Sequence, residues 1–150
     1  MKDLITIGIP SKGRLKDKAI TFFNDKGLRI LQSEKERNYF GTIENKPNIK
    51  IIFLHAKEII QRLGDGTLDL GISGLDLLNE SQKNLRDKIF INNNLNFGNA
   101  NLVVAVPDDW IDVQTIADLE EVSFDIRFKR NTRLRVATKY PNLTNDFLLS

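Results

Sequence analysis

The first eighty residues alternate two patterns, and this order constrains the fold more than any other feature. Short apolar runs that end in proline or glycine predict buried strands, and the segments between them place apolar residues at helical spacing. Strands are expected near 4–9, 49–54 and 69–72, and helices within 14–26, 56–66 and 75–81. Strand–helix alternation of this kind predicts parallel βαβ units and therefore an α/β fold.

The second half of the chain breaks this rhythm. The polar, Asn-rich segment 92–100 indicates a linker or a crossing between lobes. Apolar runs beyond it predict parallel strands near 102–106 and 134–138. Thr115 is a suitable N-cap for a helix between those strands, and a further helix is expected to begin after Pro141.

Composition excludes several classes of protein. The 22 basic and 20 acidic side chains give a net charge of +2, which is not the basic excess of a nucleic-acid coat protein. The chain has no cysteine for a disulfide or a thiolate metal site, and a single histidine cannot form a histidine cluster. No long apolar run or signal peptide is visible, so a soluble cytoplasmic protein without a membrane partner is expected.

Three strand ends have the character of anion sites. Each offers small residues, hydroxyl groups and backbone N–H groups at the start of a helix, where unpaired N–H groups favour negative charge. They are the segments 9–15 (IPSKGRL), 70–76 (LGISGLD) and 136–144 (VATKYPNLT). Any one of them alone is more simply an ordinary strand-to-helix turn. Together, with cations at Lys12, Arg14 and Lys139, they favour a phosphorylated ligand, although none matches a P-loop or a dinucleotide fingerprint.

Other polar residues have plainer interpretations. Arg37, beside Tyr39, is as readily a surface charge as a ligand. His55 ends a strand, where a neutral structural imidazole is favoured over a catalytic base. Asp69 and Asp76 could pair with cations or hold a ligand hydroxyl, but both also suit turns and helix caps. A further set of cations is best explained as a solvated face near a helix end: Arg127, Lys129, Arg130, Arg133 and Arg135.

Four motifs, in this order, resemble the catalytic subunit of ATP phosphoribosyltransferase. They are IPSKGRL (9–15), LGDGTLDLGISGLDLLNE (63–80), FGNANLVVAVP (97–107) and RVATKYPNLT (135–144). The resemblance covers almost the whole chain. It implies a fold of two α/β lobes around a cleft, like type II periplasmic binding proteins, with parallel or mixed sheets. The expected lobes are residues 1–94 and, incomplete at the C-terminus, residues 95–150.

The resemblance also implies an activity. The family opens histidine biosynthesis by joining N1 of the adenine of ATP to C1 of phosphoribosyl pyrophosphate, with release of pyrophosphate. Magnesium normally accompanies the pyrophosphate. Short catalytic subunits work as oligomers together with a regulatory subunit related to histidyl-tRNA synthetase, and no nucleic-acid partner is implied.

By the same resemblance, residues of the three loops bind substrate. Lys12 and Arg14 would lie at substrate phosphates, Arg37 would be a further phosphate ligand, and Asp76 would lie on the nucleotide side of the cleft. The complete expected set is Ser11, Lys12, Gly13, Arg14, Arg37, Ser73, Gly74, Asp76, Lys139, Asn142 and Thr144. No residue is assigned a catalytic role.

Two features depart from the family pattern. Many members have an arginine where this chain has His55. The phosphoribosyl-pyrophosphate loop, which normally lies downstream of ATKYPNLT, is absent from the 150 residues, so a truncated and inactive chain is expected. The alternative function is a non-catalytic protein of the same fold that binds a small anion or nucleotide. A nucleic-acid module built on the basic run is disfavoured by the nearly balanced charge.

Overall fold

The computed structural model describes residues 4–32 and 39–150. The chain divides into two compact units. The first comprises Met1–Asn99 together with Pro141–Ser150, and the second comprises Ala100–Tyr140. The expected lobes, 1–94 and 95–150, stay a prediction.

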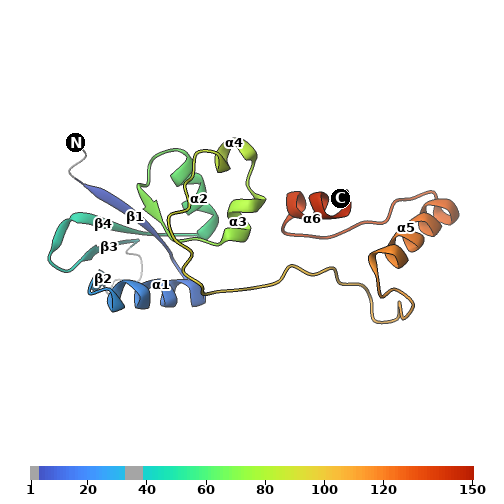
Figure 1. The fold of residues 1–150 in the computed structure, drawn as a ribbon, viewed down its shortest axis with the longest axis horizontal. Coiled ribbons are helices and arrows are strands. Elements are labelled where there is room, and N and C mark those ends of the chain that lie inside the picture. The colour runs from blue at the N-terminus through green and yellow to red at the C-terminus, as the bar shows by residue number, and fades with distance from the viewer. Residues whose placement is uncertain (1–3, 33–38) are drawn as a thin grey trace. The chain divides into compact units, whose positions relative to one another are not determined.

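The first unit is built on a mixed five-stranded sheet in the order β2-β3-β4-β1-β5 (Figure 1). Its strands are β1 (Ile5–Pro10), β2 (Ile30–Gln32), β3 (Phe40–Ile43), β4 (Lys46–Leu54) and β5 (Leu70–Gly71). The central strand β1 runs parallel to β4 on one side and to β5 on the other, as the alternating pattern predicted. The other two strands are antiparallel, with β2 paired to β3 and β3 paired to β4.

Helices cover both faces of this sheet (Figure 1). Successive residues of a strand point to opposite faces. Ile7 and Ile9 of β1 accordingly pack in one cluster with Ala19 of α1 (Gly13–Asp25). On the other face, Leu54 of β4 packs with Ile59 of α2 (Ala56–Gly64). The core of the first unit is therefore two layers of apolar side chains, one on each side of the sheet.

Two glycines allow α2 to lie close to the sheet. Gly8 and Gly71 are paired across β1 and β5. A Cβ atom at Gly8 would lie 2.7 Å from a methyl group of Leu68, and one at Gly71 would lie 2.5 Å from a methyl group of Ile59. Both distances are too short for real carbon atoms, so the missing side chains leave the space that α2 and its neighbours fill.

The remaining helices of the first unit follow β5. They are α3 (Leu75–Glu80), α4 (Lys83–Arg86) and, after the excursion through the second unit, α6 (Pro141–Leu148). The expected helices within 14–26, 56–66 and 75–81, and the one after Pro141, are confirmed.

The second unit contains one helix, α5 (Ile116–Arg130), among its described residues. Thr115 caps it as predicted, because its hydroxyl group accepts a hydrogen bond from the Asp118 N–H while the Asp118 carboxylate bonds back to Thr115. Asn131 ends α5 in the left-handed conformation, and Lys129 lies in its basic last turn.

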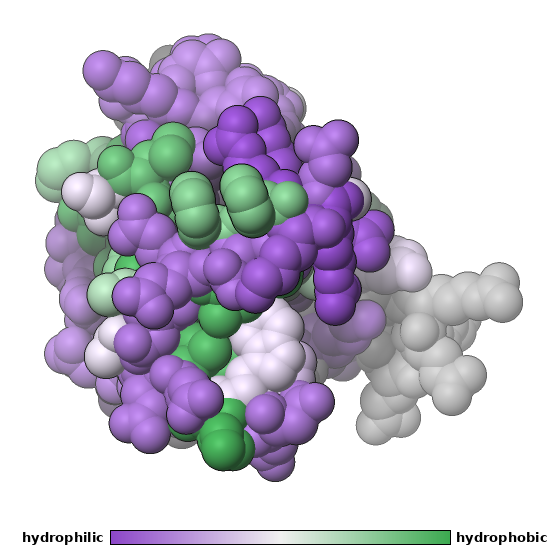
Figure 2. Space-filling view, turned by 90° about the vertical axis from the view of Figure 1, so that its right-hand side faces the viewer, coloured by the Kyte–Doolittle hydropathy of each residue, from purple (hydrophilic) through white to green (hydrophobic). Residues whose placement is uncertain are grey.

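The strands expected near 102–106 and 134–138 are wrong for this structure, because neither segment forms a strand. A strand is stabilised by hydrogen bonds to a neighbour and by burial of one face at least. Among the described residues neither segment has a paired strand, and Val103 and Val104 remain 72% and 48% exposed. On the face of the molecule that Figure 2 shows, hydrophobic residues lie at the surface among hydrophilic ones. Apolar sequence alone does not form the strand.

Strands β2 and β3 were not expected from the sequence. Both strands are short, and Gly41 weakens the expected pattern. The connection from β3 to β4 is tight, with Asn45 at a φ of 61°. Asparagine tolerates this left-handed conformation, so the Glu44–Asn45 pair was the one local signal of a hairpin.

Candidate functional site

The carboxyl ends of three parallel strands meet at one edge of the sheet. Pro10, the last residue of β1, is paired with Leu54, the last residue of β4. On the other side of β1, Gly8 is paired with Gly71 at the end of β5. Loops at this edge are where open α/β sheets bind ligands. The structure therefore brings two of the three predicted anion loops, 9–15 and 70–76, to the same edge.

The loop after β1 presents its cations to solvent. Its first residue is fixed, because the Ser11 N–H donates a 2.8 Å hydrogen bond to the Leu54 carbonyl. Lys12, Gly13 and Arg14 are exposed. Lys12 is the N-cap of α1 and its side chain makes no capping hydrogen bond, so no side chain from this position covers the first N–H groups of the helix. The start of α1 is thus suited to an anion.

Gly13 has a specific conformational reason to be glycine. Its φ of 75° lies in the left-handed region, which costs other residues roughly 1–2 kcal/mol. A Cβ atom there would meet nothing within 4 Å. Glycine is favoured here by the turn of the backbone, and the space beside it is open.

His55 begins α2 at the same edge. Its Nδ1 accepts a 3.4 Å hydrogen bond from the Lys57 N–H, and the residue is the N-cap of the helix. His55 thus makes a structural contact as a helix cap, and the neutral structural imidazole expected there stays a prediction. Its neighbour Ala56 is bonded to the third strand end, because the Ser73 hydroxyl group donates a 2.8 Å hydrogen bond to the Ala56 carbonyl. Ser73 therefore ties the loop after β5 to the start of α2.

The loop after β5 leads into α3. Gly74 is the N-cap of this short helix, and Asp76 lies in its first turn. The Asp76 carboxylate lies so close to Gly74 that a Cβ atom there would be 2.2 Å from its Oδ1. Ser73 and Gly74 are half-buried, whereas Asp76 is exposed. This loop can offer a hydroxyl group and a carboxylate to the hydroxyl groups of a sugar.

A hollow of about 530 Å³ lies at the same edge. Ser11, His55 and the end of β4 line it, together with residues that the sequence analysis did not assign to a site. The additional lining residues include Tyr39, Phe40, Glu58 and Arg62. Arg62 and Glu58 form a partly exposed ion pair of 2.7 Å on successive turns of α2. Tyr39 and Phe40 reach the hollow because β3 pairs with β4, which is the pairing that the sequence analysis missed.

The other predicted substrate residues lie elsewhere or cannot be placed. Asn142 and Thr144 lie in the first turn of α6, within the first unit. The Asn142 side chain and backbone are both bonded to Glu80. Lys139 is an exposed residue of the second unit, and Arg37 lies outside the described residues.

Asp69 lies away from the ligand edge. Its carboxylate accepts 2.8 Å hydrogen bonds from the N–H and the hydroxyl group of Thr6, which is near the amino end of β1. The structure therefore shows Asp69 bonded to Thr6 within the fold, a contact that was not among the interpretations drawn from the sequence.

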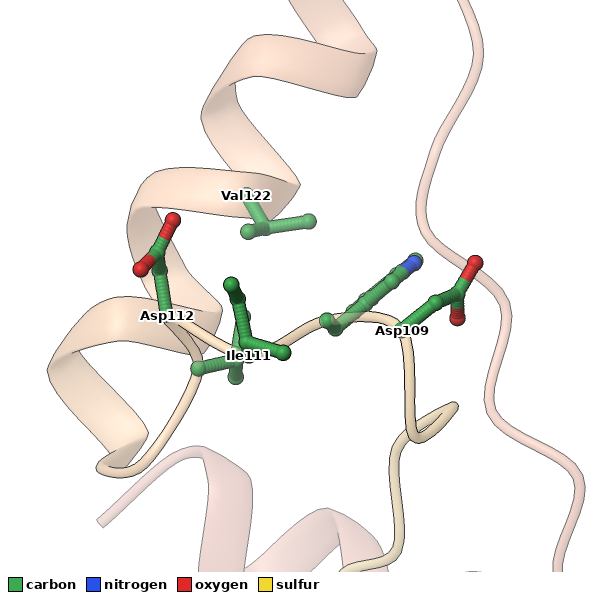
Figure 3. Close-up of a pocket in the computed structure, with 6 residues that line it drawn as sticks. Asp109, Ile111, Asp112 and Val122 are labelled. Carbon is green, nitrogen blue, oxygen red and sulfur yellow. The ribbon is translucent and has the colours of Figure 1, made fainter.

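A second hollow, of about 270 Å³, lies within the second unit between the 108–113 turns and α5 (Figure 3). Ile111 and Val122 point toward one another, and the carboxylates of Asp109 and Asp112 lie at opposite ends. None of the predicted site residues lines it.

Neither a metal-binding cluster nor a membrane-spanning helix occurs among the described residues. No group of three or more carboxylate or imidazole side chains gathers closely enough to hold a metal ion. No described helix has both the length and the apolar composition needed to cross a membrane.

Comparisons with known proteins agree with the motifs. The family model HisG, ATP phosphoribosyltransferase, matches residues 55–150. A protein of Nitrobacter winogradskyi named ATP phosphoribosyltransferase is 45% identical over the whole chain, and one of Brucella melitensis biotype 2 with the same name is 42% identical over 95% of it. The chain spans 46% and 62% of the lengths of these two relatives.

A solved structure, the ATP phosphoribosyl transferase (HisG:HisZ) complex from Thermotoga maritima, is 24% identical. The match has a TM-score of 0.41 and covers 52% of this chain and 35% of that one. The family model alone spans more than half of the chain and includes the loops after β4 and β5. The chain belongs to the ATP phosphoribosyltransferase family.

Proposed function

We propose that the protein to which this chain belongs is an ATP phosphoribosyltransferase that performs the first step of histidine biosynthesis. The observation that carries this proposal is the meeting of the loops after β1, β4 and β5 at one edge of the sheet, in a chain of this family. The loop after β1 supplies exposed cations and an uncovered helix start for phosphates. The loop after β5 supplies polar groups for a ribose or base.

The proposed reaction suits such a site. Adenine N1 of ATP attacks C1 of phosphoribosyl pyrophosphate, the new N–C bond forms, and the bond from C1 to the pyrophosphate oxygen breaks. The electron pair of that bond leaves with pyrophosphate. Adenine N1 is already nucleophilic, so the protein needs alignment and charge stabilisation more than a strong base. In this proposal Lys12 and Arg14 hold substrate phosphates, and Ser73, Gly74 and Asp76 orient the nucleotide.

Other parts of the proposal rest on the family resemblance. Magnesium would accompany the pyrophosphate of the substrate. The whole protein would have the two-lobed architecture of type II periplasmic binding proteins and would act in the cytoplasm. It would form oligomers, with itself and with a regulatory subunit related to histidyl-tRNA synthetase.

The activity is tested with the full-length protein, with and without the regulatory partner. ATP and phosphoribosyl pyrophosphate are supplied with magnesium, and formation of phosphoribosyl-ATP and of pyrophosphate is followed. We expect both products in equal amounts. If neither forms under either condition while calorimetry still detects ATP binding, the protein is the non-catalytic binding protein of the alternative hypothesis.

The role of the loop after β1 is tested by two substitutions. Lys12→Ala should weaken ATP binding about 10- to 150-fold, because a charge-assisted hydrogen bond to phosphate contributes roughly 1.5–3 kcal/mol. Arg14→Lys should also weaken binding, since lysine lacks the planar fork that holds two oxygens. Lys26→Ala, the same charge change at the other end of α1, is the matched control. If the parent and both loop variants bind ATP with equal affinity, the loop is an ordinary strand-to-helix turn and does not bind phosphate.

A further inference from the structure

Glu80 joins two parts of the first unit that are far apart in sequence. Its Oε1 accepts a 2.9 Å hydrogen bond from the Asn142 N–H, and its Oε2 accepts a 2.9 Å hydrogen bond from the Leu143 N–H. The Asn142 side-chain amide in turn donates a 2.8 Å hydrogen bond to the Glu80 backbone carbonyl. One residue at the end of α3 thus makes three hydrogen bonds to the start of α6, across 62 or 63 positions of the sequence.

Both oxygens of the carboxylate accept a hydrogen bond from α6. Each oxygen takes one backbone N–H from the first turn of α6, where N–H groups lack partners within the helix. The negative charge also lies at the positive end of the helix dipole. Bonds of this kind, with an ionised acceptor, are stronger than neutral ones.

The end of α3 is itself held in place. The Ser81 hydroxyl group donates a 2.8 Å hydrogen bond to the Leu77 carbonyl, one turn earlier. The Arg86 guanidinium group donates a 3.1 Å hydrogen bond to the Asn79 carbonyl. Glu80 is half-buried between these anchored residues. A fixed acceptor of this kind can determine where α6 begins, because the chain re-enters the first unit at Pro141.

The contact between Glu80 and Asn142 links α6 to the candidate site through α3. The same short helix that ends at Glu80 begins beside Gly74 and Asp76. The first turn of α6 carries Asn142 and Thr144, which were both expected to bind substrate. Asn142, however, donates hydrogen bonds from its side-chain amide and its backbone N–H to Glu80. Its observed contacts are those of a residue that fixes α6.

We propose that Glu80 and Asn142 form a clamp that positions the first turn of α6, and with it Thr144, for substrate binding. This inference rests on the proposed function. Glu80 and Asn142 are positioning residues in this account and neither needs to touch substrate. The clamp acts on affinity, because α6 must be docked for Thr144 to be presented, and an undocked fraction of molecules lowers the apparent affinity.

The first test measures docking in the full-length protein by amide hydrogen exchange. Glu80→Ala should raise the exchange rates of the Asn142 and Leu143 amides, while amides of β1 keep theirs. Glu80→Gln should give an intermediate result, since its side-chain carbonyl still accepts one bond. Glu120→Ala, which removes an exposed carboxylate from α5, is the matched control and should change neither rate. Unchanged exchange in Glu80→Ala would overturn the clamp while leaving the proposed function intact.

The second test separates positioning from direct substrate contact. Glu80→Ala should raise KM for ATP or for phosphoribosyl pyrophosphate about tenfold while kcat changes less than about twofold, because affinity and not chemistry is affected. Asn142→Ala should raise the same KM. In the double variant the effects should be markedly less than additive, because both changes release the same segment.

Additive effects of the two substitutions, or an unchanged KM in a variant whose exchange has risen, would overturn the positioning role. Loss of kcat alone would do the same. If the parent protein forms no product, the proposed function fails and the substrate role of the clamp fails with it. The exchange measurement then still decides whether the clamp exists.

Discussion

Two apolar runs of similar sequence have different structures in this molecule. LITIGIP at 4–10 contains β1, the central strand of the sheet, whereas NLVVAVP at 101–107 forms no strand. Ile9 is fully buried, and Val103 is 72% exposed. Both runs end in proline and favour extended backbone. The difference is that β1 has β4 and β5 on its two sides, so it satisfies its backbone groups and buries both faces.

The helices of the two units differ in the same way. α1 buries Ala19 against the sheet, whereas α5 buries none of its residues. Phe124 and Phe128 of α5 stack on each other, with ring centroids 6.3 Å apart, but are 68% and 81% exposed. α5 is held by local features, the capping box at Thr115 and the left-handed end at Asn131. Local signals therefore suffice to define a helix here, while a strand and a core require distant partners.

The largest expected effect comes from truncating the core of the first unit. Ile9→Ala should lower the free energy of unfolding by about 2–5 kcal/mol, because it removes buried methyl groups and leaves a cavity. Val104→Ala, a truncation in the unpaired run, should change it by less than about 0.5 kcal/mol. Urea unfolding of both variants measures the difference. If both variants lost the same free energy of unfolding, residues 101–107 would be buried in solution, and the two runs would not differ as the structure shows.

A smaller effect is expected from filling the space between the sheet and α2. Gly8→Ala should destabilise the first unit by about 1–3 kcal/mol, because the new methyl group meets Leu68 and Ile59 and forces them to shift. Ala105→Val, which adds volume at an exposed position of the second unit, serves as the control. Thermal unfolding compares the two. If Gly8→Ala left the unfolding temperature unchanged, α2 would not pack against β1 as closely as the structure shows.

The smallest expected effect is a loss of helical structure in the first turn of α5 at acid pH. The pKa of the Asp118 carboxyl is lowered from its ordinary value, first by the hydrogen bond from the Thr115 hydroxyl group and then by the N–H groups of Gln114 and Thr115. A lowered pKa in the folded state means that the stabilisation is present above the ordinary pKa and is lost as pH falls through the lowered value. The first turn of α5 should therefore fray in acid.

Backbone chemical shifts of residues 116–119, followed during an acid titration, measure this fraying. Asp118→Asn should shift the same signals toward the frayed state already at neutral pH and should flatten their dependence on pH. Shifts of the parent that stay constant through the acid range would show that the capping box does not hold α5.

Much of the candidate site could be predicted from the sequence, because turns and strand ends are recognised from residues that are neighbours in the chain. Pro10 and Gly13 mark the end of β1 and the turn into α1, and Ser73–Gly74 marks the corresponding turn after β5. The parallel pairing of β1, β4 and β5 followed from strand–helix alternation, since crossovers through a helix return the chain in the same direction. Thr115 was identifiable as a cap for the same reason, because a cap acts within its own turn. The cap formed by His55 was not expected from the sequence.

Strand pairing, burial and contacts between residues far apart in sequence could be seen only in the tertiary structure. Pairing of β3 with β4 brings Tyr39 and Phe40 to the hollow beside Ser11, and no periodicity in so short a strand indicates this. Burial distinguishes 4–10 from 101–107, although their sequences favour the same backbone. Glu80 meets Asn142 only because the chain returns to the first unit after Tyr140. Sequence determines which backbone conformations are favoured locally, but hydrogen-bond partners and burial belong to residues that only folding brings together.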